Sequence, residues 1–182
     1  NWTNNGTFVH NNHTVTFDGS TSQTISGFTS FYNLSINKTA NPGNEVILNS
    51  SQTILGNLNL IQCQINLNTN TIEIKQSATV SNASNSSYTR NGYLEKSFIN
   101  TATFTYPVGD GNFYRPITLA TSSSNSNDIS IASLFANQNQ SSLNSSLSSI
   151  ETYGWDIQRS SGSDGFNITI PFDASYSITD FN

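Results

Sequence analysis

The first eighty residues alternate between apolar and polar positions in short runs separated by turn residues. In the run 14–17 the apolar residues are Val15 and Phe17, and threonines occupy the other two positions. Five later runs repeat this pattern, at 34–36, 46–48, 58–60, 65–67 and 72–74. A period of two with one polar face is typical of a half-buried β-strand. The N-terminal part of the chain is therefore predicted to consist of short strands.

The apolar pairs also recur at regular distances along the chain. The pairs 34/36, 46/48 and 58/60 recur at every twelfth position, and the pairs 58/60, 65/67 and 72/74 recur at every seventh. Gly and Asn lie in the gaps between them. Such spacing favours a parallel β-solenoid, in which each coil covers the apolar row of its neighbour. A meander or a sandwich gives similar alternation and remains an alternative.

The second half of the chain has longer and more aromatic runs. The expected strands are 92–99, 102–106, 115–120, 128–135, 153–158 and 166–171. Long strands joined by turn-rich links suggest a β-sandwich. Its expected core is Phe98, Phe104, Tyr106, Ile117, Leu119, Ile129, Ile131, Trp155, Ile157, Phe166, Ile168 and Ile170.

The polar segment 81–87 (SNASNSS) separates the two halves, as a domain boundary or as the last turn of the solenoid. The prediction is an all-β chain with a parallel β-solenoid-like part at 1–80, a polar linker at 81–87 and a β-sandwich-like domain at 88–182.

Composition narrows the class of protein. Only 9% of the 182 residues are charged, and the formal net charge is −5 with six Lys and Arg. Nucleic-acid binding is disfavoured because phosphates require clustered cations. No apolar run is long enough to span a membrane as a helix. A single cysteine cannot form an internal disulfide, which disfavours a disulfide-stapled secreted domain.

Four segments carry a family resemblance: HTVTFDGSTSQTISG at 13–27, FYNLSINKT at 31–39, TYPVGDGNFYRP at 105–116 and YGWDI at 153–157. Together they resemble the large secreted and cell-surface proteins of Bacteroidetes, including the type IX-secreted and gliding-motility adhesin-like group. The resemblance implies an extracellular or cell-surface location and a place within a longer chain. It carries no catalytic motif. Partners are expected among other domains of that chain or neighbouring subunits, because the ends of a solenoid expose unpaired strand edges that must be capped or joined.

The segment 109–115 is the most distinctive candidate site. Gly109 and Gly111 are expected to supply positive φ angles in a structural turn, with Asp110 paired to Arg115. Calcium binding is the alternative, but the loop has one carboxylate where calcium takes 6–8 oxygens. Phe113 and Tyr114 follow the glycines and are the aromatic residues expected to be exposed. They are the candidate glycan-binding residues.

Other reactive side chains have simpler interpretations. His10 and His13 are expected in a surface turn rather than at a metal, and Cys63 is expected to be a buried small apolar residue. No catalytic residue, metal ligand or cofactor is predicted.

A polysaccharide-active enzyme would need two carboxylates about 5–10 Å apart. In the solenoid half only Asp18, Glu45 and Glu73 could supply them.

The function predicted from the sequence is a non-enzymatic structural or adhesive segment of a large extracellular bacterial surface protein. A carbohydrate-binding module that contacts surface glycans is the alternative, and a polysaccharide-active enzyme is the weakest of the three.

Overall fold

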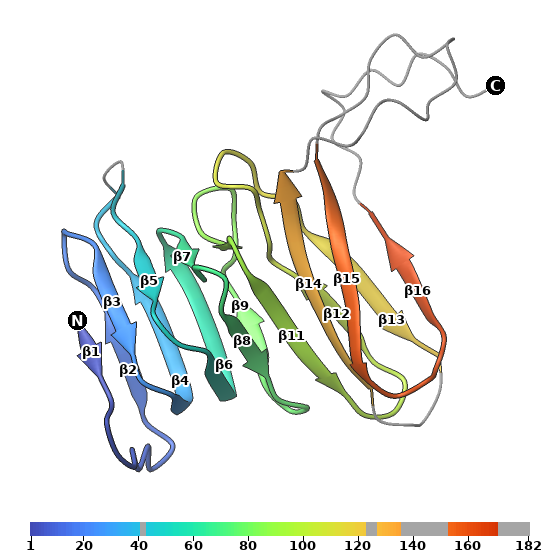
Figure 1. Ribbon diagram of the computed structural model, residues 1–182, viewed down its shortest axis with the longest axis horizontal. Coiled ribbons are helices and arrows are strands. Elements are labelled where there is room, and N and C mark those ends of the chain that lie inside the picture. Colours follow the sequence, from blue (N-terminus) through green and yellow to red (C-terminus); the bar gives the residue numbers. More distant parts are fainter. Residues whose placement is uncertain (41–42, 123–126, 136–152, 171–182) are drawn as a thin grey trace, which may run out of the picture.

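A computed structural model describes residues 1–40, 43–122, 127–135 and 153–170. These residues form three β-sheets, which confirms the all-β prediction. In Figure 1 the colours run from blue at one end of the long axis to red at the other, so neighbouring parts of the chain stack side by side.

Two sheets make up the solenoid. The five-stranded sheet has the order β1 (Trp2–Thr3), β3 (Gln23–Ser26), β5 (Val46–Leu48), β7 (Ile65–Asn66) and β10 (Thr89–Arg90). The opposite sheet contains β2 (Thr14–Phe17), β4 (Thr29–Asn37), β6 (Gln52–Gln62), β8 (Thr71–Ile74) and β11 (Tyr93–Phe98), and β9 (Thr79–Ser81) pairs with β6. All these pairs are parallel, and the solenoid has about 4 turns over residues 2–96. The solenoid prediction is therefore confirmed.

Each coil places an apolar residue directly against its equivalent in the next coil. Trp2 faces Ile25, and Ile25 faces Leu48 in the five-stranded sheet. The coils differ in length. Thr14 pairs with Asn33 in the next coil, whereas Asn37 pairs with Gln62, which lies further along the chain from its partner. The inward rows nevertheless stay aligned, and they bury most of the aliphatic side chains completely.

The regular spacing of apolar pairs at 34, 46 and 58 corresponds to half a coil. Leu34 faces Leu58 in the larger sheet, whereas Val46, halfway between them, lies on the opposite sheet. All three side chains have no exposed surface. Successive apolar pairs therefore enter one core from alternate sides.

Two buried lysines donate hydrogen bonds to the loops between strands. The ammonium group of Lys38 donates hydrogen bonds to the carbonyls of Gly19 (3.3 Å) and Thr21 (2.8 Å) and to Oε1 of Gln23 (2.6 Å). Lys96 donates in the same way to three carbonyls of the loop 75–78, at 2.7–2.9 Å. Three acceptors satisfy the three N–H bonds of an ammonium group, which is why a charged side chain is tolerated inside.

The parallel pairing continues past residue 80. β10 pairs with β7, and β11 pairs with β8, so the polar segment 81–87 lies within the last solenoid turn. The division of the chain into domains stays a prediction.

β11 is also the first strand of the antiparallel region. It pairs antiparallel with β14 (Asn127–Phe135), which pairs with β15 (Tyr153–Ser161). A separate three-stranded antiparallel sheet is formed by β12 (Thr103–Tyr106), β13 (Ile117–Thr121) and β16 (Phe166–Thr169). The Tyr106 hydroxyl donates to the Ile129 carbonyl at 2.8 Å, and the Trp155 indole donates to the Arg115 carbonyl at 2.9 Å. These bonds join the two sheets as layers of the expected sandwich-like region.

Two residues of the expected sandwich core are exposed. Ile168 is 45% exposed and Ile170 is 41% exposed, so their assignment to the core was wrong. Among the described strands β16 is at the edge of its sheet and has a neighbour on one side only. Leu119, which pairs with Ile168 from the central strand β13, has no exposed surface.

Candidate polar pocket

A pocket of about 500 Å³ lies where the loops that lead from the larger sheet into β5 and β7 meet β10 and the turn 109–115. We call it the Glu45 pocket. Its described lining consists of Ala40, Gly43, Asn44, Glu45, Gln62, Cys63, Gln64, Ser86, Arg90 and Gly111. The volume lies within the range of about 300–1,000 Å³ that is usual for small-molecule sites.

Strand register assembles the floor of this pocket. Val46 pairs with Ile65, and Ile65 pairs with Thr89, all with buried side chains. The residues next to them in sequence point outward, because successive side chains of a strand face opposite sides. Glu45, Gln64 and Arg90 are therefore brought together although they are distant in the sequence.

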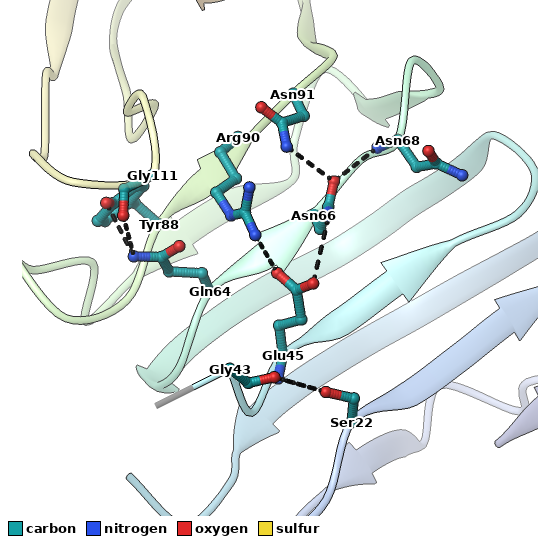
Figure 2. A network of polar contacts seen from close by, with 10 residues as sticks. All are labelled: Ser22, Gly43, Glu45, Gln64, Asn66, Asn68, Tyr88, Arg90, Asn91 and Gly111. Carbon is teal, nitrogen blue, oxygen red and sulfur yellow. Dashed lines mark hydrogen bonds and ion pairs between the residues drawn. The ribbon is translucent and has the colours of Figure 1, made fainter. Parts of the chain in front are cut away.

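A network of polar contacts fixes the floor, as Figure 2 shows. The Arg90 guanidinium pairs with Oε2 of Glu45, and Nδ2 of Asn66 donates to Oε1 of Glu45 at 3.2 Å. Oδ1 of Asn66 in turn accepts from Nδ2 of Asn91 (3.3 Å) and from the backbone N–H of Asn68 (3.1 Å). The carboxylate is thus held on both oxygens.

The turn 109–115 contributes Gly111 to the pocket lining. Nε2 of Gln64 donates to the hydroxyl of Tyr88 at 2.8 Å and to the carbonyl of Gly111 at 3.4 Å (Figure 2). Tyr88 is completely buried. Its burial raises the pKa of its hydroxyl, and the nearby Asp110 carboxylate adds to this effect. The hydroxyl acts as an acceptor for Gln64.

Asp110 organises the turn itself. Its Oδ1 accepts from the backbone N–H groups of Asn112 (2.9 Å) and Phe113 (2.8 Å), and its Oδ2 accepts from Nε of Arg115 (3.3 Å). The Asp110 side chain has no exposed surface. Its oxygens are committed to the turn, which does not favour the calcium alternative.

The two glycines of the turn have different roles. Gly111 has a φ of 98°, as expected, but Gly109 does not have a positive φ. A Cβ at Gly109 would lie 2.3 Å from the Tyr88 ring and 2.4 Å from the Phe113 carbonyl. The expectation for Gly109 was wrong because close packing, and not backbone handedness, requires glycine there.

The predicted glycan-binding aromatics lie beside the pocket, not in its lining. Tyr114 stacks on Tyr88 with ring centroids 5.7 Å apart, and its burial raises its pKa. It is only partly exposed, so the expectation that Tyr114 is exposed was wrong. Phe113 is 56% exposed, and the Arg115 guanidinium lies over its ring. Their role in glycan binding stays a prediction.

Two polar atoms in the lining residues are buried without a partner. Among the described residues, Oδ1 of Asn44 and Nε of Arg90 have no hydrogen-bond partner. Asn44 is 8% exposed, and its Nδ2 already donates to the Thr39 carbonyl at 2.5 Å. Leaving a buried polar atom unpaired costs about 1–3 kcal/mol, so such atoms are unusual outside functional or hydrated sites.

The histidines lie in a turn on another part of the surface. The His10 ring stacks on Tyr32, and its Nδ1 accepts from the Asn12 N–H at 2.9 Å. Asn11 and Asn12 have positive φ angles, which gives the turn its shape. Cys63 is buried, and its Sγ contacts the Thr39 carbonyl at 3.3 Å.

Two of the three candidate carboxylates of the solenoid half, Glu45 and Glu73, are separated by the fold. Glu45 lies on the outer face of the five-stranded sheet, whereas Glu73, on β8, lies on the outer face of the opposite sheet. Glu73 accepts from the Thr53 hydroxyl at 3.1 Å and pairs with Lys75. Two carboxylates on opposite faces cannot flank one glycosidic bond.

Sequence reasoning did not identify Gln64, Arg90 or Asn44 as site residues. The sequence does show a polar residue beside each inward aliphatic residue. Only the strand register shows which of these polar residues lie next to one another in the fold. Within the described ranges, no group of three His, Cys, Asp or Glu side chains could hold a metal ion. The same residues contain no helix long and apolar enough to cross a membrane.

Comparisons with protein-family models, with curated proteins and with solved structures found no match to this chain.

Proposed function

We propose that this chain is a non-enzymatic structural segment of a large extracellular bacterial surface protein, which extends and presents the rest of that protein. The observation that carries the proposal is the single core that runs from the first coil into the antiparallel region. The core begins with residues such as Phe17 and Ile25 and ends with Ile129 and Ile131. Stacked coils with a continuous core form an elongated unit in which each coil is stabilised by its neighbours.

The outer face of the larger sheet supports an extracellular role. Its two polar rows are in register across four strands: Thr14, Asn33, Asn57 and Thr79 form one, and Thr16, Ser35, Asn59 and Ser81 form the other. Their side chains bond to one another, as in the bonds from Asn33 to Thr14 (3.2 Å) and from Thr79 to Asn57 (2.9 Å). Uncharged ladders of this kind stay hydrated without depending on ionic strength.

The sequence resemblance to secreted Bacteroidetes surface proteins supports the same proposal, and adhesion is then a property of the whole molecule. Partners are other domains of the same chain or neighbouring subunits, and surface glycans are the alternative.

Protease treatment of intact cells of the source organism tests the location and the role together. An antibody raised against residues 1–122 should detect a large polypeptide that externally added protease removes while cytoplasmic marker proteins survive. Detection of the chain only inside the cells, protected until lysis, would overturn the proposal.

A further inference from the structure

We propose that the Glu45 pocket binds a neutral saccharide. This inference goes beyond the structural role above and does not depend on it, because a binding pocket can occur on a segment of any location.

Charge balance in the pocket selects the class of ligand. Glu45 and Arg90 are the only charged residues in its described lining, and they pair with each other. An anion such as sulfate would be repelled by the Glu45 carboxylate, and the pocket lacks the excess of cations that anion sites require. A cation would meet the Arg90 guanidinium. An uncharged ligand faces neither repulsion.

The hydrogen-bonding groups that remain available favour hydroxyls over apolar ligands. Gln64 uses its Nε2 within the protein, which leaves Oε1 as an acceptor. The Gln62 side-chain amide makes no hydrogen bond to another described residue, so it offers both donors and acceptors. A carboxylate has about four lone-pair sites, of which the described partners of Glu45 occupy two. A sugar hydroxyl both donates and accepts, so it can satisfy this mixed set, whereas an apolar ligand would leave it unpaired.

The pocket is also held in a fixed shape before any ligand arrives. Parallel strands place Glu45 and Gln64, Asn66 orients the carboxylate, and Gln64 is bonded to Tyr88 and Gly111. A preorganised site loses less conformational entropy on binding, which matters for weakly binding sugars.

Nuclear magnetic resonance titration of the whole chain tests the proposal. The probes are the methyl glycosides of glucose, galactose, mannose and N-acetylglucosamine, with sodium sulfate as the anionic comparison. We expect at least one glycoside to shift the side-chain amide signals of Gln62 and Gln64 and the backbone signal of Gly111 in a saturable way. Sulfate should leave these signals in place.

Substitutions separate a binding role from a structural one. Gln62→Leu breaks no hydrogen bond within the described fold and should weaken glycoside binding by roughly tenfold, the effect of losing one hydrogen bond. Glu45→Gln should weaken glycoside binding and allow sulfate to shift the same signals. Glu73→Gln is the matched control. Glu73 is also an acid paired with a base, Lys75, but it lies on β8, away from the pocket. This substitution should leave glycoside binding and the response to sulfate unchanged.

Three results would overturn the proposal. They are no saturable shift of these signals with any of the four glycosides, a stronger response to sulfate than to the glycosides in the unmodified protein, or equal weakening by Gln62→Leu and Glu73→Gln.

Discussion

The solenoid and the antiparallel region are built from similar alternating strands, but they obtain their register in different ways. In the solenoid each strand pairs with the equivalent segment one coil later, so that Ile25 lies against Leu48 and Leu34 against Leu58. In the antiparallel region β12 pairs with β13 and β14 with β15, its neighbours in the chain. Repetition sets the register of the first region, and individual contacts set that of the second.

The cores differ accordingly. Most solenoid rows stack aliphatic on aliphatic, apart from one aromatic cluster of Trp2, Phe8 and Phe31 in the first coils. The antiparallel region relies more on edge-to-face rings, with Phe104 4.9 Å from Tyr106 and 6.5 Å from Phe98. Edge-to-face pairs need a specific geometry. The solenoid should therefore tolerate the loss of a whole coil better than the antiparallel region tolerates the loss of one strand.

Removal of one coil gives the strongest test of this difference. Deletion of residues 24–46 joins Gln23 to Ile47, and because Gln23 pairs with Val46, the register of both sheets is preserved. Val15 should then lie against Leu58, its equivalent two coils later. We expect a cooperatively folded protein that is shorter by about 5 Å, the distance between neighbouring strands, in small-angle X-ray scattering.

Deletion of residues 24–47 is the control for this experiment. It removes one residue more, which shifts the register of the next strand by one residue and moves its inward side chains to the outer face. Loss of cooperative unfolding is expected for this variant. Equal stability of the two deletions would show that repetition does not set the register.

A cavity within one coil should have the next largest effect. Leu58 has no exposed surface and lies between Leu34 and Val80, so Leu58→Ala is expected to lower the free energy of unfolding by about 2–5 kcal/mol. Ile168→Ala removes the same kind of side chain from an exposed position in β16 and should cost less than about 1 kcal/mol.

The two tryptophans allow this effect to be followed in each region separately. Trp2 lies in the first coil and Trp155 in β15. In urea unfolding of variants that keep one tryptophan each, Leu58→Ala should shift the Trp2 transition more than the Trp155 transition, because coils contact mainly their neighbours. Identical shifts at both probes would mean that the two regions unfold as one unit.

The solenoid could be predicted from the sequence because its signal is repeated. Leu34 and Leu58 are separated by two equal intervals with Val46 at the midpoint, and parallel pairing converts that double interval into direct contact. Each further coil repeats the signal, so one irregular turn does not hide it. The continuation through 81–87 was harder to foresee because that segment has no apolar pair to mark an inward row.

The pocket could not be predicted in the same way. The coil from Val46 to Ile65 is shorter than the next one, from Ile65 to Thr89, so no constant interval connects Glu45 with Arg90.

The buried lysines could not be predicted from the sequence either. Alternation places Lys96 inward between Leu94 and Phe98, yet its charge argues for the surface, and only the ring of carbonyls around its ammonium group resolves the conflict.

The smallest expected effect is a pH dependence that compares these two lysines. Burial lowers the pKa of Lys96 from 10.5 to about 8, and burial also lowers the pKa of Lys38. Between pH 8 and 10.5 the unfolded chain therefore holds more protons than the folded one, so the free energy of unfolding should rise with pH. Lys96 should contribute no more than about 3 kcal/mol, from 1.36 kcal/mol per pKa unit.

Buried tyrosines limit the rise at its upper end. Burial raises the pKa of Tyr106 well above the ordinary value of 10.0, and burial raises that of Tyr88 as well. Above pH 10 the unfolded chain loses tyrosine protons that the folded chain retains, which lowers the free energy of unfolding. Stability should therefore be greatest near pH 10.

Urea unfolding of the unmodified protein and of Lys96→Met, measured from neutral pH to about pH 11, checks this expectation. The methionine variant should lose most of the rise between pH 8 and 10, because Met has no proton to release. The part of the rise that remains reports Lys38, within the solenoid, whereas the part that is lost reports Lys96, on the strand where parallel pairing gives way to antiparallel pairing. An unchanged rise in Lys96→Met would show that the charge at this boundary is not the source of the pH dependence.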